Sequence, residues 1–453
     1  MSALAQLLLA LGHNVSGSDR YYDQGLSLLI LKKLRALGVT LFPQNGGGVR
    51  DDQDVVVVSS AIEEDNPDLV AAREKKIKIL HRAELLASLA ERKKIIAVTG
   101  TAGKTTVTGM IGFCLEQAGW DPMVVNGGAV LNWLDGKRPG NFRFGRSNTW
   151  VLELDESDRS LLHFAPDWAV VTNISQDHFE LEEVKSLFAT FARQVKNGIV
   201  GCDSCKDFAK IGPHDPSDDG TNLISVTERG VSFQYKNHKF QLPLLGKHNI
   251  ENALNCVMLC EQLGLDLNGV SLALEKFKGI ERRLQAAGSG NGVTIVDDYA
   301  HNPVKIAAAW DAVRPFSKRI LAVWRPHGYG PLKLMRRDLI DVFLKRVRPE
   351  DLLVVMSVYF AGGTAQKQFT ARMFAEELGE RNIPVEYADD YEAVRAVLLK
   401  FARPGDTVLL MGARDPDLPV FARNFVLDLD HFLADRPSGA GGVAQEDQSS
   451  DQA

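Results

Sequence analysis

Residues 100–106 read Gly-Thr-Ala-Gly-Lys-Thr-Thr, a glycine-containing turn that carries a lysine and several threonine hydroxyls. The apolar run 94–98 before this turn predicts a buried strand, and the helical spacing of apolar residues over 107–118 predicts a helix after it. A glycine turn between a strand and a helix is the setting of a phosphate-binding loop, because N–H groups at the helix start point at a bound anion. The turn therefore predicts a nucleoside triphosphate site.

In this interpretation Lys104 would reach the β and γ phosphates, and the hydroxyl of Thr105 would bind a magnesium ion. The loop departs from the usual spacing, because Val98 stands where the first glycine is expected and the glycine falls at position 100. The alternative is a glycine turn with an ordinary surface lysine. The other loop residues expected at the nucleotide are Gly100, Thr101, Ala102, Gly103 and Thr106.

An acidic segment follows the next apolar run, 149–154. Four carboxylates stand within six positions: Glu153, Asp155, Glu156 and Asp158. They would repel one another unless a cation or solvent relieves the repulsion. Magnesium prefers one or two carboxylates together with phosphate and water oxygens. A magnesium site facing the phosphates is therefore one interpretation, and a solvated acidic turn is the other.

A polar pair, Asp177 and His178, follows the predicted strand 168–173. This position corresponds to the carboxyl edge of a parallel sheet, where ligands bind in open α/β folds. His178 is a candidate metal contact, although a lone histidine is more often structural.

Composition excludes several classes of protein. The 453 residues suggest about three domains at roughly 150 residues each. A net charge of −6 gives no support for nucleic-acid binding. No apolar run is long enough to span a bilayer, and the apolar residues 1–11 have no basic segment before them, so we expect no signal peptide. These features favour a cytoplasmic protein without membrane insertion, and they leave its oligomeric state open.

The five cysteines do not indicate a disulfide framework. Cys202 and Cys205 form a C-x-x-C pair, but no second pair offers the spacing of a zinc site, so a turn at a strand end is the simpler interpretation. Cys256 and Cys260 are expected on one face of a helix, in the core. The fifth is Cys114.

Alternating strand and helix patterns predict an α/β protein of three domains, with boundaries at 1–88, 89–283 and 284–435. The C-terminal domain is expected to hold a doubly wound parallel sheet. Residues 436–453 are rich in Gly, Ser, Gln and Asp, which predicts a disordered tail. Further expected strands are 54–60, 77–80, 293–297, 319–324, 352–358, 385–387 and 407–411, and further expected helices are 26–37, 67–73 and 249–263.

Together these residues resemble the Mur ligase family, ATP-dependent enzymes that form amide bonds in peptidoglycan synthesis. The resemblance covers nearly the whole chain, and so many motifs in one order make it specific. It rests on the phosphate loop, on Glu-Leu-Asp-Glu-Ser-Asp (153–158), Thr-Asn through Asp-His (172–178), Gly-Lys-His-Asn (246–249) with Asn252, Arg-Arg (282–283) and Asp-Asp-Tyr-Ala-His-Asn-Pro (297–303). In the first domain, Val-Ser-Gly-Ser-Asp (15–19), Ser-Ser-Ala-Ile (59–62) and His-Arg-Ala-Glu (81–84) look like the alanine-adding members.

The resemblance implies a Rossmann-like first domain for the UDP group, a central P-loop ATPase-like domain and a Rossmann-like last domain for an amino acid. It implies that Thr105 and Glu153 hold one magnesium ion and His178 a second. It places Asn249 and Asn252 on the adenine side, Arg283 and Asp298 over the nucleotide, and Lys104, His178, Arg283 and His301 among the catalytic groups. The expected UDP-substrate contacts are Ser18, Asp19, Ser59, Ser60 and Arg82.

The chemistry implied is phosphorylation of a carboxylate of UDP-N-acetylmuramate by ATP, followed by attack of an amino acid, L-alanine by preference, on the acyl phosphate. Such steps need positioning and charge neutralisation rather than a covalent protein nucleophile. The alternatives are a muropeptide-recycling ligase, another amino acid, a non-catalytic nucleotide-binding relative, or the substrates of folylpolyglutamate or cyanophycin synthetases. The segments 59–62 and 155–158 argue against the last of these.

The sequence departs from the family at two places. The glycine loop expected for the UDP diphosphate would lie just before Met1, so the first domain is expected to lack its first strand or to begin upstream. Gly328 and Pro331 stand where the alanine-adding enzymes carry arginines near the amino-acid end of the site. The residues that could replace those arginines are Arg325, Lys333, Arg336 and Arg337, of which the last three are otherwise solvated helix charges.

Overall fold

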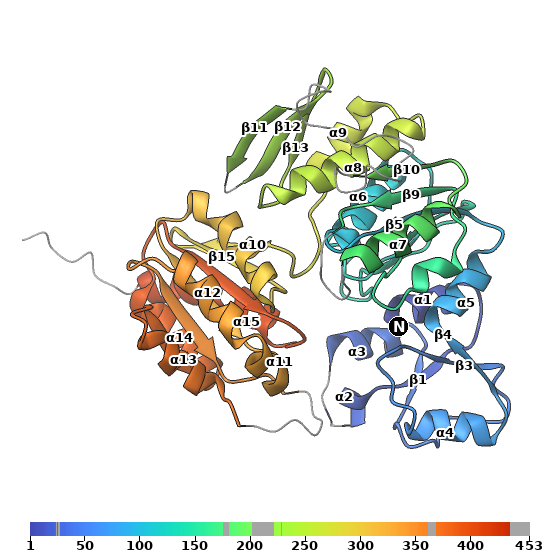
Figure 1. The fold of residues 1–453 in the computed structure, drawn as a ribbon, viewed down its shortest axis with the longest axis horizontal. Helices are drawn as coiled ribbons and strands as arrows, with labels where there is room; N and C mark the ends of the chain where they lie inside the picture. Colours follow the sequence, from blue (N-terminus) through green and yellow to red (C-terminus); the bar gives the residue numbers. More distant parts are fainter. Residues whose placement is uncertain are drawn as a thin grey trace, which may run out of the picture. The chain divides into compact units, whose positions relative to one another are not determined.

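The computed structural model describes residues 1–434 except 24, 26, 27, 175–180, 202–221, 228 and 361–367. The chain forms two compact units, Met1–Gln285 and Ala286–Ala453, which we describe separately (Figure 1). The domain boundaries expected at 88/89 and 283/284 stay predictions. The expected tail at 436–453 and the pair Cys202 and Cys205 lie outside the described residues.

A six-stranded sheet forms the centre of the first unit, in the order β10-β9-β5-β8-β6-β7. Every neighbouring pair is parallel except β6 and β7. The strands are β5 (Lys94–Thr99), β6 (Met123–Val125), β7 (Phe142–Arg143), β8 (Thr149–Glu153), β9 (Trp168–Val171) and β10 (Gly198–Gly201). The strands expected at 94–98, 149–154 and 168–173 are confirmed, each within two residues of its end.

Helices cover both faces of this sheet, because alternate residues of each strand point to opposite sides. Ile96 and Val98 of β5 face the cluster formed with α6 (Lys104–Gln117), α8 (His248–Gln262) and α9 (Leu267–Glu275). Ile95 and Ala97 face the cluster formed with α1 (Ser2–Ala10), α5 (Arg82–Ala90) and α7 (Leu181–Ala192). The 3-10 helix η1 (Ser160–His163) also contributes to the second cluster.

A small antiparallel sheet, which the sequence did not lead us to expect, packs beside α8 and α9 (Figure 1). It consists of β11 (Asn222–Thr227), β12 (Gly230–Tyr235) and β13 (His238–Leu242). Phe233 and Phe240 stack across it with ring centroids 5.2 Å apart, and the Tyr235 hydroxyl donates to Glu261 of α8 at 3.0 Å.

The N-terminal part of the first unit holds two separate two-stranded parallel sheets. One pairs β1 (Ser16–Ser18) with β2 (Thr40–Phe42), and the other pairs β3 (Val55–Val58) with β4 (Lys78–His81). The helices are α2 (Arg20–Asp23), α3 (Leu29–Ala36) and α4 (Pro67–Glu74). The helix expected at 67–73 is confirmed, and the one expected from 26 begins at Leu29.

The second unit contains a doubly wound sheet in the order β14-β15-β19-β16-β17-β18, and its pairs from β15 to β18 are parallel. This confirms the fold class expected for the C-terminal domain. The strands are β14 (Gln285–Gly290), β15 (Val293–Asp298), β16 (Ile320–Arg325), β17 (Leu352–Met356), β18 (Val385–Ala388) and β19 (Thr407–Gly412). The helices are α10 (Pro303–Val313), η3 (Arg314–Phe316), α11 (Tyr329–Leu334), α12 (Arg336–Arg346), α13 (Ala371–Gly379), α14 (Tyr391–Phe401) and α15 (Leu418–Ala434).

The two faces of this sheet have different cores. Leu410 and Leu321 point into a cluster with Leu398 of α14 and Phe425 of α15. On the opposite face Trp324 of β16 contacts aromatic rings of α12 and α13 at centroid distances of 5.7 Å. Among the described helices of the whole chain, none is long and apolar enough to cross a membrane.

Candidate nucleotide site and the carboxyl-edge cluster of the second unit

The phosphate loop joins β5 to α6, and two of its positions accept only glycine. Gly100 has φ +128° and Gly103 has φ +83°, a region that L side chains rarely adopt. A Cβ on Gly100 would lie 2.2 Å from the Thr172 hydroxyl oxygen, and a Cβ on Gly103 would lie 2.4 Å from the Asn252 side-chain oxygen. The loop is therefore shaped by contacts with β9 and α8 as well as by its own sequence.

The end of β9 fixes the loop by hydrogen bonds. The Thr101 hydroxyl and the Ala102 N–H both donate to the Asn173 side-chain oxygen, at 2.6 and 2.9 Å. The Thr172 hydroxyl donates to the Ala102 carbonyl at 2.5 Å. The segment Thr172-Asn173, part of the family resemblance at 172–178, thus holds the phosphate loop in place.

Lys104 lies at the first position of α6, in a largely enclosed setting. Its ammonium donates to the Gly100 carbonyl at 2.8 Å and to Glu156 at 2.6 Å, and Asp155 lies 3.8 Å away. The Lys104 side chain is 16% exposed and that of Glu156 only 3%. Burial raises the pKa of Glu156, while the charge of Lys104 opposes that rise. This is not the environment of the solvated surface lysine considered as the alternative.

Glu153, at the end of β8, accepts two hydrogen bonds. The Thr105 hydroxyl donates to one carboxylate oxygen at 2.9 Å, and the Gly127 N–H donates to the other at 2.6 Å. A Cβ on Gly127 would lie 2.7 Å from both oxygens, so the glycine lets the backbone approach the carboxylate. Burial raises the pKa of Glu153, against the effects of these hydrogen bonds and of the Lys104 and Arg283 charges. Carboxylate and hydroxyl oxygens are the donors that magnesium prefers.

The other residues expected at the nucleotide within this unit are Asn249 and Asn252 on α8, Thr106 on α6, and Arg283. Asn252 donates to the Asn249 side-chain oxygen at 2.9 Å, and Asn249 donates to the Leu245 carbonyl at 2.7 Å. Thr106 is buried in the first turn of α6. Arg283 is exposed and acts electrostatically on Glu153. His178 and Asp177 lie outside the described residues, so the second expected metal contact stays a prediction.

The expected UDP-substrate residues fall into two groups. Arg82 at the start of α5 pairs with Asp158 at 2.7 Å, and Ser60 donates to the same carboxylate at 3.4 Å. Although burial opposes it, hydrogen bonding to Ser160 and the Arg82 charge lower the pKa of Asp158. The acidic turn after β8, which contains Asp158, is therefore contacted by two segments. One holds Ser59 and Ser60, and the other holds Arg82.

Ser18 and Asp19, at the end of β1, make contacts within the N-terminal part of the unit. The Ser18 hydroxyl donates to Asp68, and Asp19 accepts from the Tyr21 N–H at 2.9 Å. The structure thus brings Ser60 and Arg82 together at Asp158 but gives Ser18 and Asp19 different partners.

In the second unit Asp298 is the last residue of β15, and His301 follows the strand. Asp298 is buried and accepts from the Ala300 N–H at 2.7 Å. The His301 Nδ1 lies 2.9 Å from the Tyr299 carbonyl, and the two rings meet edge to face at 5.7 Å. Both residues therefore stand at the carboxyl edge of this sheet, where ligands bind in doubly wound folds.

The same edge carries a charged cluster that the sequence did not reveal. Arg325, at the end of β16, pairs with the fully buried Asp415 at 2.5 Å, and the Tyr391 hydroxyl donates to the same carboxylate. The Arg325 guanidinium lies 5.3 Å from the Tyr359 ring centroid and 5.4 Å from that of Tyr391. Asp415 lies three residues after the end of β19, and that position after a buried strand was the one available signal. Arg325, one of the candidates for the missing arginines, is thus engaged inside this cluster.

His327 lies next to this cluster in the chain. Its buried Nδ1 has no hydrogen-bond partner among the described residues, and its ring lies 6.2 Å from that of Tyr359. Burial, together with the charges of Arg414 and His301, lowers the pKa of His327 to about 4. We therefore expect a neutral imidazole at neutral pH.

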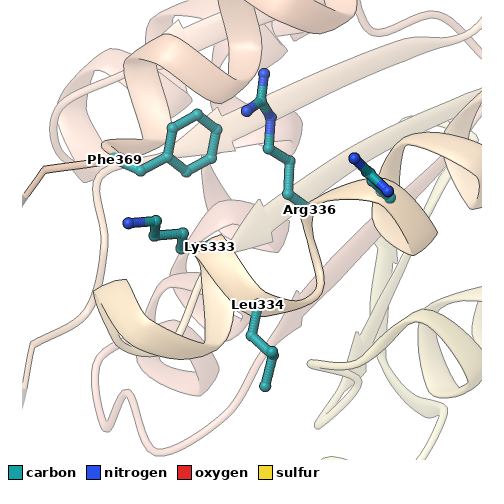
Figure 2. A pocket seen from close by; sticks show the side chains of 5 residues that line it. Lys333, Leu334, Arg336 and Phe369 are labelled. Atoms are coloured by element: carbon teal, nitrogen blue, oxygen red, sulfur yellow. The ribbon is translucent and has the colours of Figure 1, made fainter.

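The other candidates for the missing arginines line a depression of about 390 Å³ with Leu334 and Phe369 (Figure 2). Figure 2 shows Lys333 and Arg336 on either side of the Phe369 ring, with Leu334 pointing away from it. Arg336 is held by Glu377 at 2.5 Å and lies 4.8 Å over that ring. Arg336 is therefore an ion-paired helix residue.

The fold and the first site together define a multidomain α/β protein with a P-loop-type nucleotide site. Three family models match consecutive parts of the chain: the Mur ligase family catalytic domain at residues 1–94, the Mur ligase middle domain at 98–260, and the Mur ligase glutamate ligase domain at 282–414. The chain belongs to the Mur ligase family, and the family is ATP-dependent.

Curated relatives match along most of their length. A UDP-N-acetylmuramate–L-alanine ligase of Synechococcus sp. (strain JA-2-3B'a(2-13)) is 35% identical over 93% of this chain and 89% of its own length. The enzyme of the same name from Myxococcus xanthus is 34% identical, over 92% and 90%. Among solved structures, a UDP-N-acetylmuramate–alanine ligase from Thermotoga maritima has a TM-score of 0.77 at 25% identity, covering 94% of this chain and 96% of its own.

Proposed function

We propose that this protein is an ATP-dependent ligase that joins L-alanine to UDP-N-acetylmuramate in peptidoglycan synthesis. Enzymes with that name share 34–35% of their residues with it over more than nine tenths of the chain. The observation that carries the proposal is the arrangement of Lys104 and Glu153 around a phosphate loop that β9 and α8 hold in shape.

The reaction would proceed through an acyl phosphate. A carboxylate oxygen of the sugar nucleotide attacks the γ-phosphorus of ATP, and ADP leaves. The amine of the amino acid then attacks the acyl carbon, and inorganic phosphate leaves. Lys104 would exchange its contact with Glu156 for phosphate oxygens and so neutralise the charge that develops on the transferred group. Backbone N–H groups of the loop would orient the phosphates.

A magnesium ion fits the oxygen atoms of Thr105 and Glu153, which already point at each other across 2.9 Å. When bound, the ion would offset negative charge on the β and γ phosphates. Asn249 and Asn252 would lie on the adenine side, which the contact of Asn252 with Gly103 supports. Arg283 would add positive charge near Glu153. His178 remains the candidate second metal ligand.

The remaining expected residues are assigned to the UDP-sugar, to the nucleotide and to the incoming amino acid. Ser18, Asp19, Ser59, Ser60 and Arg82 would contact the UDP-sugar. Asp298 and His301, at the carboxyl edge of the second sheet, would serve the nucleotide and the incoming amine. The cytoplasmic location expected from composition is part of the proposal, since ATP and nucleotide sugars are cytoplasmic metabolites.

The test is phosphate release with defined partners. The protein is incubated with ATP, magnesium and UDP-N-acetylmuramate, and L-alanine, glycine, L-serine, other amino acids and an alanyl tripeptide are then added one at a time. We expect release to require both partners and kcat/KM to be highest with L-alanine. Release only with the tripeptide would reassign the protein as a muropeptide ligase. No release with any amine would refute the ligase. The control is Lys104→Ala, whose thermal stability should equal that of the parent chain, so that a loss of phosphate release cannot be due to unfolding.

A further inference from the structure

Three thiols that the proposed function does not use meet in the core of the first unit. Cys114 lies on α6, and Cys256 and Cys260 lie one turn apart on α8. Their sulfur atoms all lie within 4.8 Å of one another, and those of Cys114 and Cys256 are 3.8 Å apart. None of the three residues is more than 1% exposed.

We propose that these cysteines form a site for a trivalent thiophilic ion of the arsenic(III) class. With ion–sulfur bonds of about 2.3 Å, as thiolates form with zinc, three sulfurs around one ion lie roughly 3.4–4.0 Å apart, from pyramidal to planar geometry. The observed separations therefore need only small side-chain shifts to reach a three-sulfur coordination shell.

Coordination number and charge select the ion. Within the described part of the chain no histidine or carboxylate completes the group to four ligands, whereas structural zinc sites are almost always tetrahedral. Three thiolates around zinc would also leave a net negative charge in an apolar core, which is unfavourable. A trivalent ion with three thiolates is neutral and needs no fourth ligand.

The binding step balances without an external oxidant. Arsenous acid, As(OH)3, exchanges its three hydroxyl groups for three cysteine sulfurs, and each thiol proton leaves with a hydroxyl as water. Arsenic stays trivalent throughout. Because arsenous acid is small and uncharged at neutral pH, its entry through a local opening of α6 and α8 requires no burial of charge.

The site joins two helices that carry the nucleotide site. Lys104 is the first residue of α6, and Asn252, which fits against Gly103, precedes Cys256 by one turn of α8. A bound ion would cross-link α6 to α8 behind the phosphate loop. We therefore expect arsenite to raise the melting temperature and to change the affinity for ATP.

The test uses a background in which Cys202 and Cys205, which lie outside the described residues, are replaced by serine, so that only the three core thiols remain. Native mass spectrometry after incubation with arsenite should show one arsenic atom gained and three protons lost. Cys260→Ala should weaken binding at least 100-fold. Met258→Leu, a buried substitution on the same helix, should leave it unchanged.

Three results would overturn the proposal: no arsenic uptake by the background protein, equal uptake after Cys260→Ala, or tighter binding of Zn(II) than of arsenite. Should Cys260→Ala fail to fold, Cys114→Ala provides the same comparison from the other helix. Should the background itself fold poorly, the native sequence and its Cys260→Ala variant are compared instead. The variant should bind one equivalent of arsenic less than the native sequence. None of these measurements depends on ligase activity.

Discussion

Two carboxyl-edge clusters, one in each unit, pair a cation with a carboxylate in different ways. In the first unit Lys104 touches Glu156, from the turn after β8, and the two side chains are 16% and 3% exposed. In the second unit Arg325 is paired with an Asp415 that is fully buried and that also accepts from Tyr391. The two pairs are about equally enclosed, since Arg325 and Asp415 are 17% and 0% exposed. They differ in their partners: the second pair is also held by Tyr391, whereas the first lies at the phosphate loop, where we expect an incoming anion to open it.

The difference between the two clusters suggests different roles: the first takes part in the reaction, and the second holds the structure around it. A lysine whose partner carboxylate is destabilised by burial has an alternative partner available as soon as phosphate oxygens arrive. An arginine that is paired, hydrogen-bonded and stacked between two tyrosine rings loses much if any one contact is removed. We therefore expect substitutions in the first cluster to change turnover and substitutions in the second to change stability.

The largest effect is expected from Lys104→Ala. Removing the ammonium takes away the charge that would stabilise the transferred phosphoryl group, and we expect kcat to fall about 1,000-fold, at the upper end for one electrostatic donor. Steady-state phosphate release measures it. Lys94→Ala, at the exposed opposite end of β5, is the matched control and should keep full activity. A Lys104→Ala enzyme with more than a tenth of the parental kcat would contradict the role assigned to the loop.

Asp415→Asn is the counterpart in the second unit. It keeps the side-chain shape but leaves the half-buried Arg325 without its counter-charge, and breaking such a pair costs about 3 kcal/mol. Urea unfolding measures the loss, and Asp341→Asn, at an exposed position of α12, is the control. A loss below about 1 kcal/mol, the size expected for an exposed ion pair, would show that the cluster is no more than a surface interaction.

The same contrast explains what could be predicted from the sequence. The phosphate loop and Glu153 were predictable, because a glycine turn and an acidic run are contiguous and follow recognisable strands. Tyr391 and Asp415 were not, because each is a single polar residue. Tyr391 begins α14 and Asp415 follows β19, which lies next to β16, so only the tertiary fold brings them to Arg325.

Other features depend on contacts distant in sequence. The small antiparallel sheet of β11, β12 and β13 was not predicted from the sequence. The hydrogen bonds that the phosphate loop donates to Asn173 could not be predicted from the sequence either, because they join two different strand ends. The sequence therefore predicted the elements that we propose carry chemistry more readily than the contacts that hold them in place.

Glu153→Gln, in the first cluster, should lower the activity of the protein but raise its stability at neutral pH. Loss of the carboxylate charge should lower kcat about 100-fold by weakening magnesium binding, and raising the magnesium concentration should restore part of it. Folding should respond in the opposite direction. Burial raises the pKa of Glu153 in the folded state, so ionisation at neutral pH destabilises the fold.

The raised folded-state pKa of Glu153 also predicts how the stability of the protein depends on pH. Below the unfolded-state pKa, near 4.3, Glu153 is protonated in both states and the two proteins should be equally stable. As the pH rises through the folded-state pKa, the parent should lose stability relative to Glu153→Gln. Urea unfolding at a series of pH values measures this difference. A variant less stable than the parent at pH 7 would mean that the hydrogen bonds to Thr105 and Gly127 outweigh the cost of burial.

His327→Gln is expected to have the smallest effect and is specific to the second unit. The folded-state pKa of His327, about 4, lies below its ordinary value near 6.5, because burial and nearby positive charge disfavour the imidazolium. Since the unfolded chain binds the proton more tightly, the parent should lose stability as the pH falls from about 6.5 toward 4, and the glutamine variant should lose less. Urea unfolding across that window measures the difference, with His163→Gln, exposed in the first unit, as the control for removing a histidine. Parallel curves for the parent and His327→Gln would show that protonation of this ring does not disturb the cluster. The pair of Arg325 with the buried Asp415 would then be the only charge-sensitive element that these variants detect at this edge of the sheet.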